Sequence, residues 1–310
     1  MKKNLLSAGV FSGVIFCGIS AAFDVFVANI TQNLEPAVFI VYCFIISTVV
    51  FLTIGAFKNG TSYLDKAKKS IPLLSLVNIA VLLNWGGLIF ALKYLEPAVV
   101  GIASVACGPA LTIVISRYFI RGTSTPDKTE SSIAWIILFG VIVMLINSYF
   151  GKSGVINTSY FERTTGIICV ICSAIGTVLY TFYSKDLSKK GWKSYEILGF
   201  RNILMLLLAL GYCAYNNIHL YLTENLLLIV IFLSVIGHVI PIFLIQKSIS
   251  TLDPIHVSLL LLLLPVFTLA LQFFDDRIFI SWESISAVFA ITFFLIFLCI
   301  TKIHAGKKGV

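Results

Sequence analysis

Ten runs of about 20 mostly apolar residues occupy most of this 310-residue chain, and short polar connections join them. A helix needs roughly 20 apolar residues to cross the hydrocarbon core of a bilayer, so each run is long enough. With 59% hydrophobic and 12% charged residues, the chain has more apolar surface than a soluble domain buries. The sequence therefore predicts an all-α polytopic membrane protein with ten transmembrane helices. The expected spans are 6–31, 36–57, 71–92, 97–119, 132–150, 165–184, 195–215, 225–247, 254–275 and 282–302.

The 22 Lys and Arg residues are distributed unevenly among the connections. With the N-terminus in the cytoplasm, 17 of them lie on the cytoplasmic side, and Arg201 lies within a span. This excess follows the positive-inside rule and predicts that both termini are cytoplasmic, in a membrane of the bacterial inner (cytoplasmic) type. The net charge of +8 is spread over loops, so membrane lipids are expected partners and nucleic acid is not. The four outside cations are Lys93, Lys152, Arg163 and Arg277.

No motif for covalent chemistry is present. The sequence has no P-loop, H-E-x-x-H or G-x-S-x-G pattern, so we expect no enzyme and no cofactor. The seven cysteines all lie in apolar runs, which is typical of free, inert thiols. Cys169 and Cys172 form C-x-x-C, but no second pair or histidine ligand follows, so we expect no metal site.

Polar residues stand beside helix breakers at matching places in two of the runs. Asn84 precedes Trp85 and a glycine pair, and His238 precedes a proline, 154 positions later (238 minus 84). A helix in lipid must satisfy its backbone polar groups internally, so matched breakers indicate where the backbone faces a cavity. Prolines in the fourth and ninth runs predict further kinks. The expected helix breakers are Gly86, Gly87, Pro109, Pro241 and Pro265.

The chain also divides into two halves, 1–150 and 151–310. The motif L-E-P-A-V occurs at 34–38 and again at 95–99. Proline at the first helical position, with an acid at the positive helix end, is a helix-start signal, and we interpret both glutamates as structural caps. Asp253-Pro254 repeats this start in the second half, on the cytoplasmic side. We therefore predict two inverted five-helix repeats.

Asp24 and Arg201 are charged residues that lie well inside the predicted spans. A carboxylate at Asp24 is costly in the membrane and tends to be functional, although the first helix would place it at the outer interface if it ended earlier. Arg201 either snorkels to the inner surface or holds an anionic group. His238 by itself is most simply a packing residue, and its match to Asn84 makes it a candidate. Asp24 is also the candidate for coupling to protons, because hydration of a cavity changes which protonation state is favoured.

The two asparagines of the third run, Asn78 and Asn84, lie on roughly opposite helix faces. We expect Asn84 to face the cavity and Asn78 to form a helix–helix hydrogen bond. Trp85 and Tyr180 are expected aromatic walls. The turn at 275–277 is most simply solvated. The candidate substrate-binding residues are Asn84, Trp85, Tyr180, Arg201 and His238.

Several stretches together resemble the EamA type of the drug/metabolite transporter superfamily. They are A-L-K-Y-L-E-P-A at 91–98 leading to Pro109, and the stretch 247–265 in the second half. The stretch 166–185, which includes Tyr180, is similar to the start of that family's second repeat. The resemblance implies a ten-helix inverted repeat, a central cavity formed by helices 1 to 4 and 6 to 9, and alternating access without ATP.

The sequence departs from that family's pattern in two helices. Ala22-Phe23-Asp24 stands where the family often has Trp-Gly in the first helix, and Tyr42-Cys43 where it often has Arg in the second. Arg201 in the seventh helix matches that arginine.

We expect a secondary active or facilitative transporter of a small polar or amphipathic metabolite. Asp24, Arg201, Asn84 and the aromatic residues favour an amino acid or a related compound. Exchange of a larger nucleotide-like metabolite remains an alternative. So does a non-transporting membrane scaffold or lipid-handling protein, although such a protein needs neither an intramembrane acid nor paired breakers. Import or export, the mode of coupling and the oligomeric state stay open.

Overall fold

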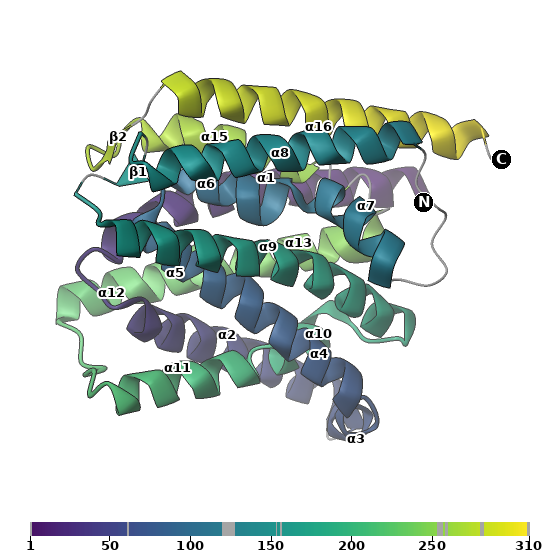
Figure 1. The fold of residues 1–310 in the computed structure, drawn as a ribbon. Coiled ribbons are helices and arrows are strands. Elements are labelled where there is room, and N and C mark those ends of the chain that lie inside the picture. Colours follow the sequence, from purple (N-terminus) through teal and green to yellow (C-terminus); the bar gives the residue numbers. More distant parts are fainter. Residues whose placement is uncertain are drawn as a thin grey trace.

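The computed structural model is a bundle of helices with one short strand pair (Figure 1). It describes residues 2–60, 62–119, 128–152, 154–155, 157–252, 257, 260–279 and 282–308. The first half contains α1 Lys2–Ile30, α2 Pro36–Asn59, α3 Ser62–Lys69, α4 Ile71–Val81, η1 Leu82–Gly86, α5 Gly87–Tyr94, α6 Pro97–Gly101, η2 Ile102–Ala106, α7 Gly108–Phe119 and α8 Lys128–Tyr149. The second half contains β1 Gly154–Val155, α9 Tyr160–Lys189, α10 Ser194–Phe200, α11 Ile203–Tyr215, α12 Glu224–Phe232, η3 Leu233–Val239, α13 Ile240–Thr251, α15 Leu263–Gln272, β2 Ile278–Phe279 and α16 Trp282–Lys308.

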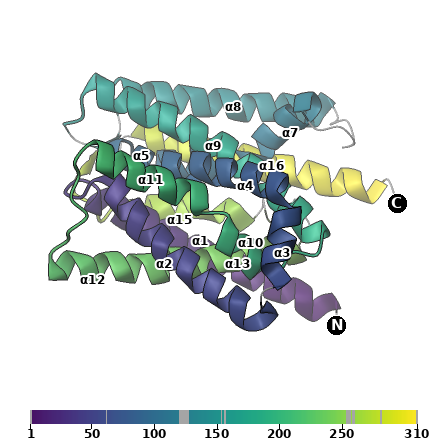
Figure 2. The same cartoon turned by 90° about the horizontal axis from the view of Figure 1, so that it is seen from below.

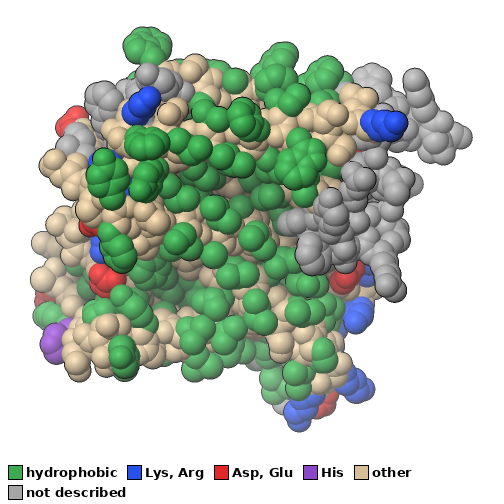
Figure 3. Space-filling model, viewed as in Figure 1, with side chains coloured by type: hydrophobic (Ala, Val, Ile, Leu, Met, Phe, Trp, Pro, Cys, Tyr) green, Lys and Arg blue, Asp and Glu red, His purple; other side chains and the backbone are tan. Residues whose placement is uncertain are grey.

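Within these described residues, eight helical stretches are long and apolar enough to cross a membrane. Two shorter apolar stretches, Leu263–Gln272 and Ser284–Leu298, correspond to the ninth and tenth expected spans. Figure 3 shows apolar side chains over the flank of the bundle and charged side chains toward its two ends. The prediction of an all-α membrane fold with ten spans is therefore confirmed.

Several spans are interrupted by wider, π-helical turns. The segment η1 holds Asn84, and η3 holds His238, so the two matched places in the sequence carry the same backbone irregularity. Such π segments are rare and are found frequently at functional sites. The chain continues as α5 after η1 and as α13 after η3, so the helices do not end at the expected breakers. Each helix contains a widened turn there instead.

The glycines near these turns allow close helix packing. A Cβ added at Gly87 would collide with the backbone of α9 at Cys169 and Ser173. A Cβ added at Gly176 of α9 would collide in turn with the backbone of Asn84. Gly87 therefore lies in the contact between α5 and α9, which is a role that the sequence interpretation did not assign to it.

The helix pairs follow a regular pattern between the two predicted halves. The third span (α4, η1 and α5) packs on the sixth (α9), and the eighth (η3 and α13) packs on the first (α1). The second span (α2) packs on the seventh (α10 and α11), the fourth (α6) on the ninth (α15), and the fifth (α8) on the tenth (α16). If each span is replaced by the span five places away in the sequence (the first by the sixth, the second by the seventh, and so on), the same set of pairs results. Figures 1 and 2 show α8 and α16 running along the outside of the bundle.

Both helices with an acid–proline start begin where the sequence predicted, at Pro36 and Pro97. Glu35 and Glu96 occupy the N-cap positions, as interpreted, but neither side chain forms a capping hydrogen bond. Glu35 instead pairs with Lys93, with 3.3 Å between Oε2 and Nζ. Glu96 is fully buried and accepts hydrogen bonds from α15 and α16, described below. The third such start, Asp253-Pro254, lies outside the described residues.

Candidate functional site

A cavity of about 590 Å³ lies in the middle of the bundle. Its walls come from α1, η1, α5, η2, α7, α9, α13, α15 and the turn that follows α10. Aromatic and aliphatic side chains, among them Phe23, Trp85 and Leu88, form most of its surface. Pro109 is the one expected helix breaker among the described lining residues. The polar and charged residues that line the cavity are Ser20, Asp24, Asn84, Thr112, Thr177, Tyr180, Thr181, Lys185 and Arg201.

Asp24 lies well inside the first span, as the sequence indicated. The helix α1 continues to Ile30, and the Asp24 side chain is only 4% exposed. It lines the cavity and has no hydrogen-bonding partner among the residues that the structure describes. A buried carboxylate without a partner is energetically costly, so it suits a site that receives a cation or a proton from elsewhere.

Arg201 is positioned by a break in the seventh span. The helix α10 ends at Phe200 and α11 starts at Ile203, so Arg201 stands in the turn between them. Asn78 of α4 satisfies the groups that the break frees: its Nδ2 donates to the Phe200 carbonyl at 2.9 Å, and its Oδ1 accepts from the Leu204 N–H at 3.0 Å. The expected helix–helix hydrogen bond of Asn78 is therefore present.

The guanidinium of Arg201 does not snorkel to the surface. It is 1% exposed and lies over the ring of Tyr180, with 4.8 Å between Cζ and the ring centroid. Its Nε and Nη2 atoms are buried and have no hydrogen-bonding partner in the described part of the chain. Because both residues line the cavity, an anion entering it meets a cation held against an aromatic face.

The amide of Asn84 is held from the side of α9. Its Oδ1 accepts from Thr177 Oγ1 at 3.1 Å, and its backbone carbonyl accepts from Ser173 Oγ at 2.8 Å. With the oxygen engaged, Nδ2 has no partner among the described residues. Asn84 therefore offers a hydrogen-bond donor at the cavity wall.

His238 lies behind the cavity wall and is not one of its lining residues. It is fully buried, and neither ring nitrogen has a partner among the described residues. Its ring centroid lies 4.4 Å from that of Trp85 and 4.7 Å from that of Phe44, and Phe23 is also close. Trp85 and Phe23 thus separate His238 from the cavity. Gly86, Gly87, Pro241 and Pro265 are likewise absent from the lining that the structure describes.

Sequence reasoning missed Thr177, Thr181 and Lys185, which line the cavity from α9. Together with Ser173, Thr177 and Thr181 recur at every fourth position, and this spacing could have indicated one polar face of the helix. It also missed the depth at which Glu96 is buried, because its pattern is typical of a helix start at the surface.

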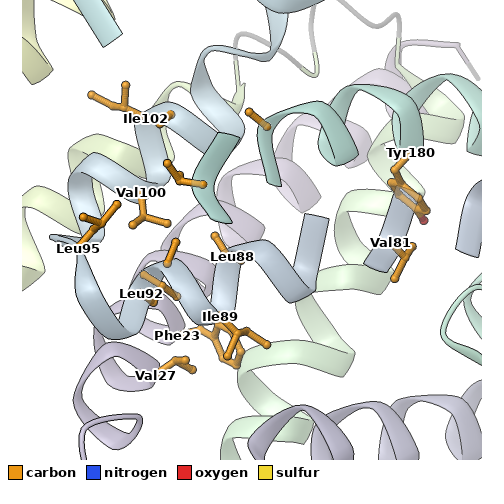
Figure 4. Close-up of a cluster of buried hydrophobic side chains, with 14 of the residues drawn as sticks. Phe23, Val27, Val81, Leu88, Ile89, Leu92, Leu95, Val100, Ile102 and Tyr180 are labelled. Carbon is orange, nitrogen blue, oxygen red and sulfur yellow. The ribbon is translucent and has the colours of Figure 1, made fainter. Parts of the chain in front are cut away.

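The two ends of the bundle differ. Both chain termini lie at one end, and β1 and β2 lie at the other (Figure 1). The cavity extends toward the end with the termini, because its α9 lining residues run from Thr177 to Lys185, in the second half of the helix. Figure 4 shows part of the apolar cluster, to which α1, α5 and α6 contribute side chains such as Phe23, Ile89 and Val100.

Polar contacts close the end with the strand pair. Gln272 of α15 donates from Nε2 to Glu96 at 2.5 Å and accepts from the Ala98 N–H at 3.0 Å, and Ser284 of α16 donates to Glu96 at 3.0 Å. Arg277 donates to the Ala28 carbonyl at 2.7 Å and pairs with a buried Asp275. The expectation of a solvated turn at 275–277 is therefore wrong, since this turn is tied to α1.

Comparisons with known proteins agree with this architecture. Residues 164–301 match the EamA-like transporter family. A solved structure titled "Crystal structure of protein" matches with a TM-score of 0.63 and 17% sequence identity, and the match covers 95% of each chain. At this identity the likeness shows a common fold. A search of curated proteins found no match.

The apolar bundle defines a multi-pass membrane protein, and its residues 164–301 carry the match to the EamA-like transporter family. Residues 164–301 form an EamA-like transporter domain, of the drug/metabolite transporter superfamily, and the predicted resemblance is confirmed.

Proposed function

We propose that this protein carries a small metabolite with both a carboxylate and an amine, an amino acid or a related compound, across the membrane by alternating access. The observation that carries the proposal is that Arg201 and Asp24 line one cavity and that neither side chain has a hydrogen-bonding partner among the described residues. Each buried charge is costly without a counter-charge, and a zwitterion supplies both counter-charges at once.

Each end of such a substrate has a suitable partner. A carboxylate accepts two parallel hydrogen bonds from a guanidinium, and Asn84 Nδ2 is a further donor at the same wall. An ammonium group suits the Asp24 carboxylate. Trp85, Phe23 and Leu88 then provide an apolar surface for the rest of the molecule. A cavity of about 590 Å³ is within the range of small-molecule sites.

The charges of the lining disfavour a nucleotide-like substrate. Arg201 and Lys185 are its described cations, and Asp24 would repel a phosphate that occupied the same volume. A scaffold or lipid-handling role leaves two buried charges unexplained.

Alternating access is supported by the difference between the two ends of the bundle. The cavity extends toward the end with the termini, and polar contacts tie α6, α15 and α16 together at the opposite end. The exchange pattern of helix pairs supports equivalent repeats at 1–150 and 151–310. A pair of equivalent repeats gives a second state by exchanging their arrangements, which would close the first end and open the second. We propose that the end with the termini is cytoplasmic, in keeping with the distribution of lysines.

Asp24 is also our candidate for coupling transport to protons. A carboxylate that is hydrated in one state and enclosed in the other has a different proton affinity in each, and such a difference links proton movement to the conformational change. In Asp24→Asn proteoliposomes, accumulation driven by a pH gradient should vanish, while substrate exchange continues at a substrate concentration high enough to offset weaker binding of the ammonium group. Accumulation that keeps its dependence on pH would show that Asp24 carries no proton.

The first experiment is counterflow in proteoliposomes that contain the full-length protein. Vesicles are loaded in turn with each of the 20 common amino acids, and uptake of the same radiolabelled compound is followed. We expect accelerated counterflow for at least one amino acid, and none from protein-free vesicles. If no amino acid is active and vesicles loaded with a nucleotide in the same assay show counterflow, the nucleotide exchanger replaces this proposal.

A further inference from the structure

We propose that Gln246 of α13 is a positioning residue for Arg201 and acts through Tyr180. Gln246 does not line the cavity, and it is fully buried between helices. The inference extends the proposed function, because it names the residue that orients the anion-binding group of that site.

Gln246 links two residues of α9. The Tyr180 hydroxyl donates to Gln246 Oε1 at 2.6 Å, and Gln246 Nε2 donates to Ser184 Oγ at 2.9 Å. Tyr180 and Ser184 are four residues apart, so they lie on the same face of α9. One buried amide thereby fixes the Tyr180 hydroxyl in position. Because a phenol O–H prefers to lie in the plane of its ring, this hydrogen bond also favours one orientation of the ring.

The ring in turn orients the guanidinium. Arg201 Cζ lies 4.8 Å from the ring centroid, and Nε and Nη2 have no hydrogen-bonding partner among the described residues. The Tyr180 face is therefore the described contact that sets the direction of the guanidinium at the cavity wall. If Gln246 were removed, the hydroxyl would lose its acceptor, and both the ring and the cation above it would gain freedom.

The position of Gln246 also connects this site to the helix that carries the π segment. The helix α13 continues directly from η3 and packs against α1, which carries Asp24. A movement of α13 would therefore displace Gln246 and act on Arg201 through Tyr180. The conformational change would in this way alter the affinity of Arg201 for the anionic group of the substrate.

The test measures the reactivity of Arg201 toward phenylglyoxal, an arginine reagent, in the purified full-length protein, by mass spectrometry. In Gln246→Leu we expect the modification rate to rise about fivefold, the factor that corresponds to one lost hydrogen bond. Tyr180→Phe keeps the ring but loses the hydroxyl, so it should have the same effect with less disturbance of packing. The double variant should be no faster than either single variant, because both remove the same link.

Ser248→Ala is the matched control, since Ser248 is buried on the same helix and its Oγ donates to the Gly9 carbonyl, away from Arg201. Its Arg201 reactivity should equal that of the unmodified protein. The proposal is overturned if Gln246→Leu and Tyr180→Phe leave the rate unchanged, or if Ser248→Ala raises it equally.

This reactivity does not depend on any substrate. If it changes as expected and the counterflow panel contains no active amino acid, the proposed function fails while the positioning role of Gln246 stands. For an active amino acid, Gln246→Leu should raise KM about fivefold with an unchanged maximal rate.

Discussion

Asn78 donates a hydrogen bond from Nδ2 to the carbonyl of Phe200 at 2.9 Å, across the contact between the third and seventh spans. The same side chain accepts from the Leu204 N–H, so one amide closes both sides of the interruption in the seventh span. Backbone groups inside a membrane protein must be satisfied, and this contact lets the chain turn at Arg201 without leaving them exposed.

We predict that Asn78→Leu destabilises the protein by about 1 to 3 kcal/mol, because it removes the acceptor of the partly buried Leu204 N–H and a donor to the Phe200 carbonyl. Thermal unfolding in detergent measures the effect. Asn216→Ala is the control, since the exposed Asn216 side chain bonds only to the Tyr212 carbonyl of its own helix among the described residues. An equal midpoint for Asn78→Leu and the unmodified protein would mean that the break does not depend on Asn78.

The contact between Gly176 and Asn84 should tolerate no side chain. Gly176→Ala places a Cβ against the Asn84 backbone and the Ala80 carbonyl, so we expect a loss of about 1 to 3 kcal/mol. Gly211 on α11 has open space at the same position, and there alanine should be neutral or slightly stabilising. Thermal unfolding of both variants decides the point, and a similar small effect at the two glycines would contradict the described packing.

The hydrogen bonds that Glu96 accepts from α15 and α16 should control access to the cavity from the end of the bundle with the strand pair. We expect Gln272→Leu to weaken the closed end, because it removes both the donor to Glu96 and the acceptor for the Ala98 N–H. The measurement uses Leu88→Cys in a background without other cysteines, since Leu88 lines the cavity. Labelling by a membrane-impermeant maleimide added to intact cells should become faster by about fivefold, the factor for one hydrogen bond.

Thr268→Val is the control for this prediction. Thr268 is a buried residue of the same helix α15, and its Oγ1 donates to the Leu264 carbonyl of that helix. Labelling of Leu88→Cys in this background should keep its original rate. If Gln272→Leu also leaves the rate unchanged, the Glu96 contacts are structural and do not gate the cavity.

The number and type of helices followed from the sequence because each span had to be about 20 apolar residues long. The intramembrane position of Asp24 and the helix–helix bond of Asn78 followed from the same reasoning, since a polar group in lipid needs a partner or a cavity. Arg201 remained ambiguous, because only the tertiary structure shows that the seventh span breaks beside it and that Tyr180 lies under it.

The pairing of Asn84 with His238 was only partly informative. The sequence offset located two π segments, but it could not show that Trp85 stands between His238 and the cavity. Gln246 and Gln272 gave no signal, since a single glutamine in an apolar run is predicted equally well as a packing residue. Their partners come from other helices, and only the folded chain brings these together.

In the proposed transport cycle, Arg201 and Asp24 hold opposite ends of one substrate. A competition experiment on counterflow tests this arrangement with an active amino acid, its amide and its deaminated acid, such as leucine, leucinamide and 4-methylpentanoate. Arg201→Gln should weaken the binding of the two compounds with a carboxylate about tenfold or more and leave the binding of the amide unchanged, since a hydrogen bond to a charged group contributes roughly 1.5 to 3 kcal/mol. Asp24→Asn should weaken the binding of the two compounds with an amine and leave the binding of the deaminated acid unchanged. Equal losses for all three compounds in both variants, or no loss in either, would show that these two residues do not hold opposite ends of a substrate.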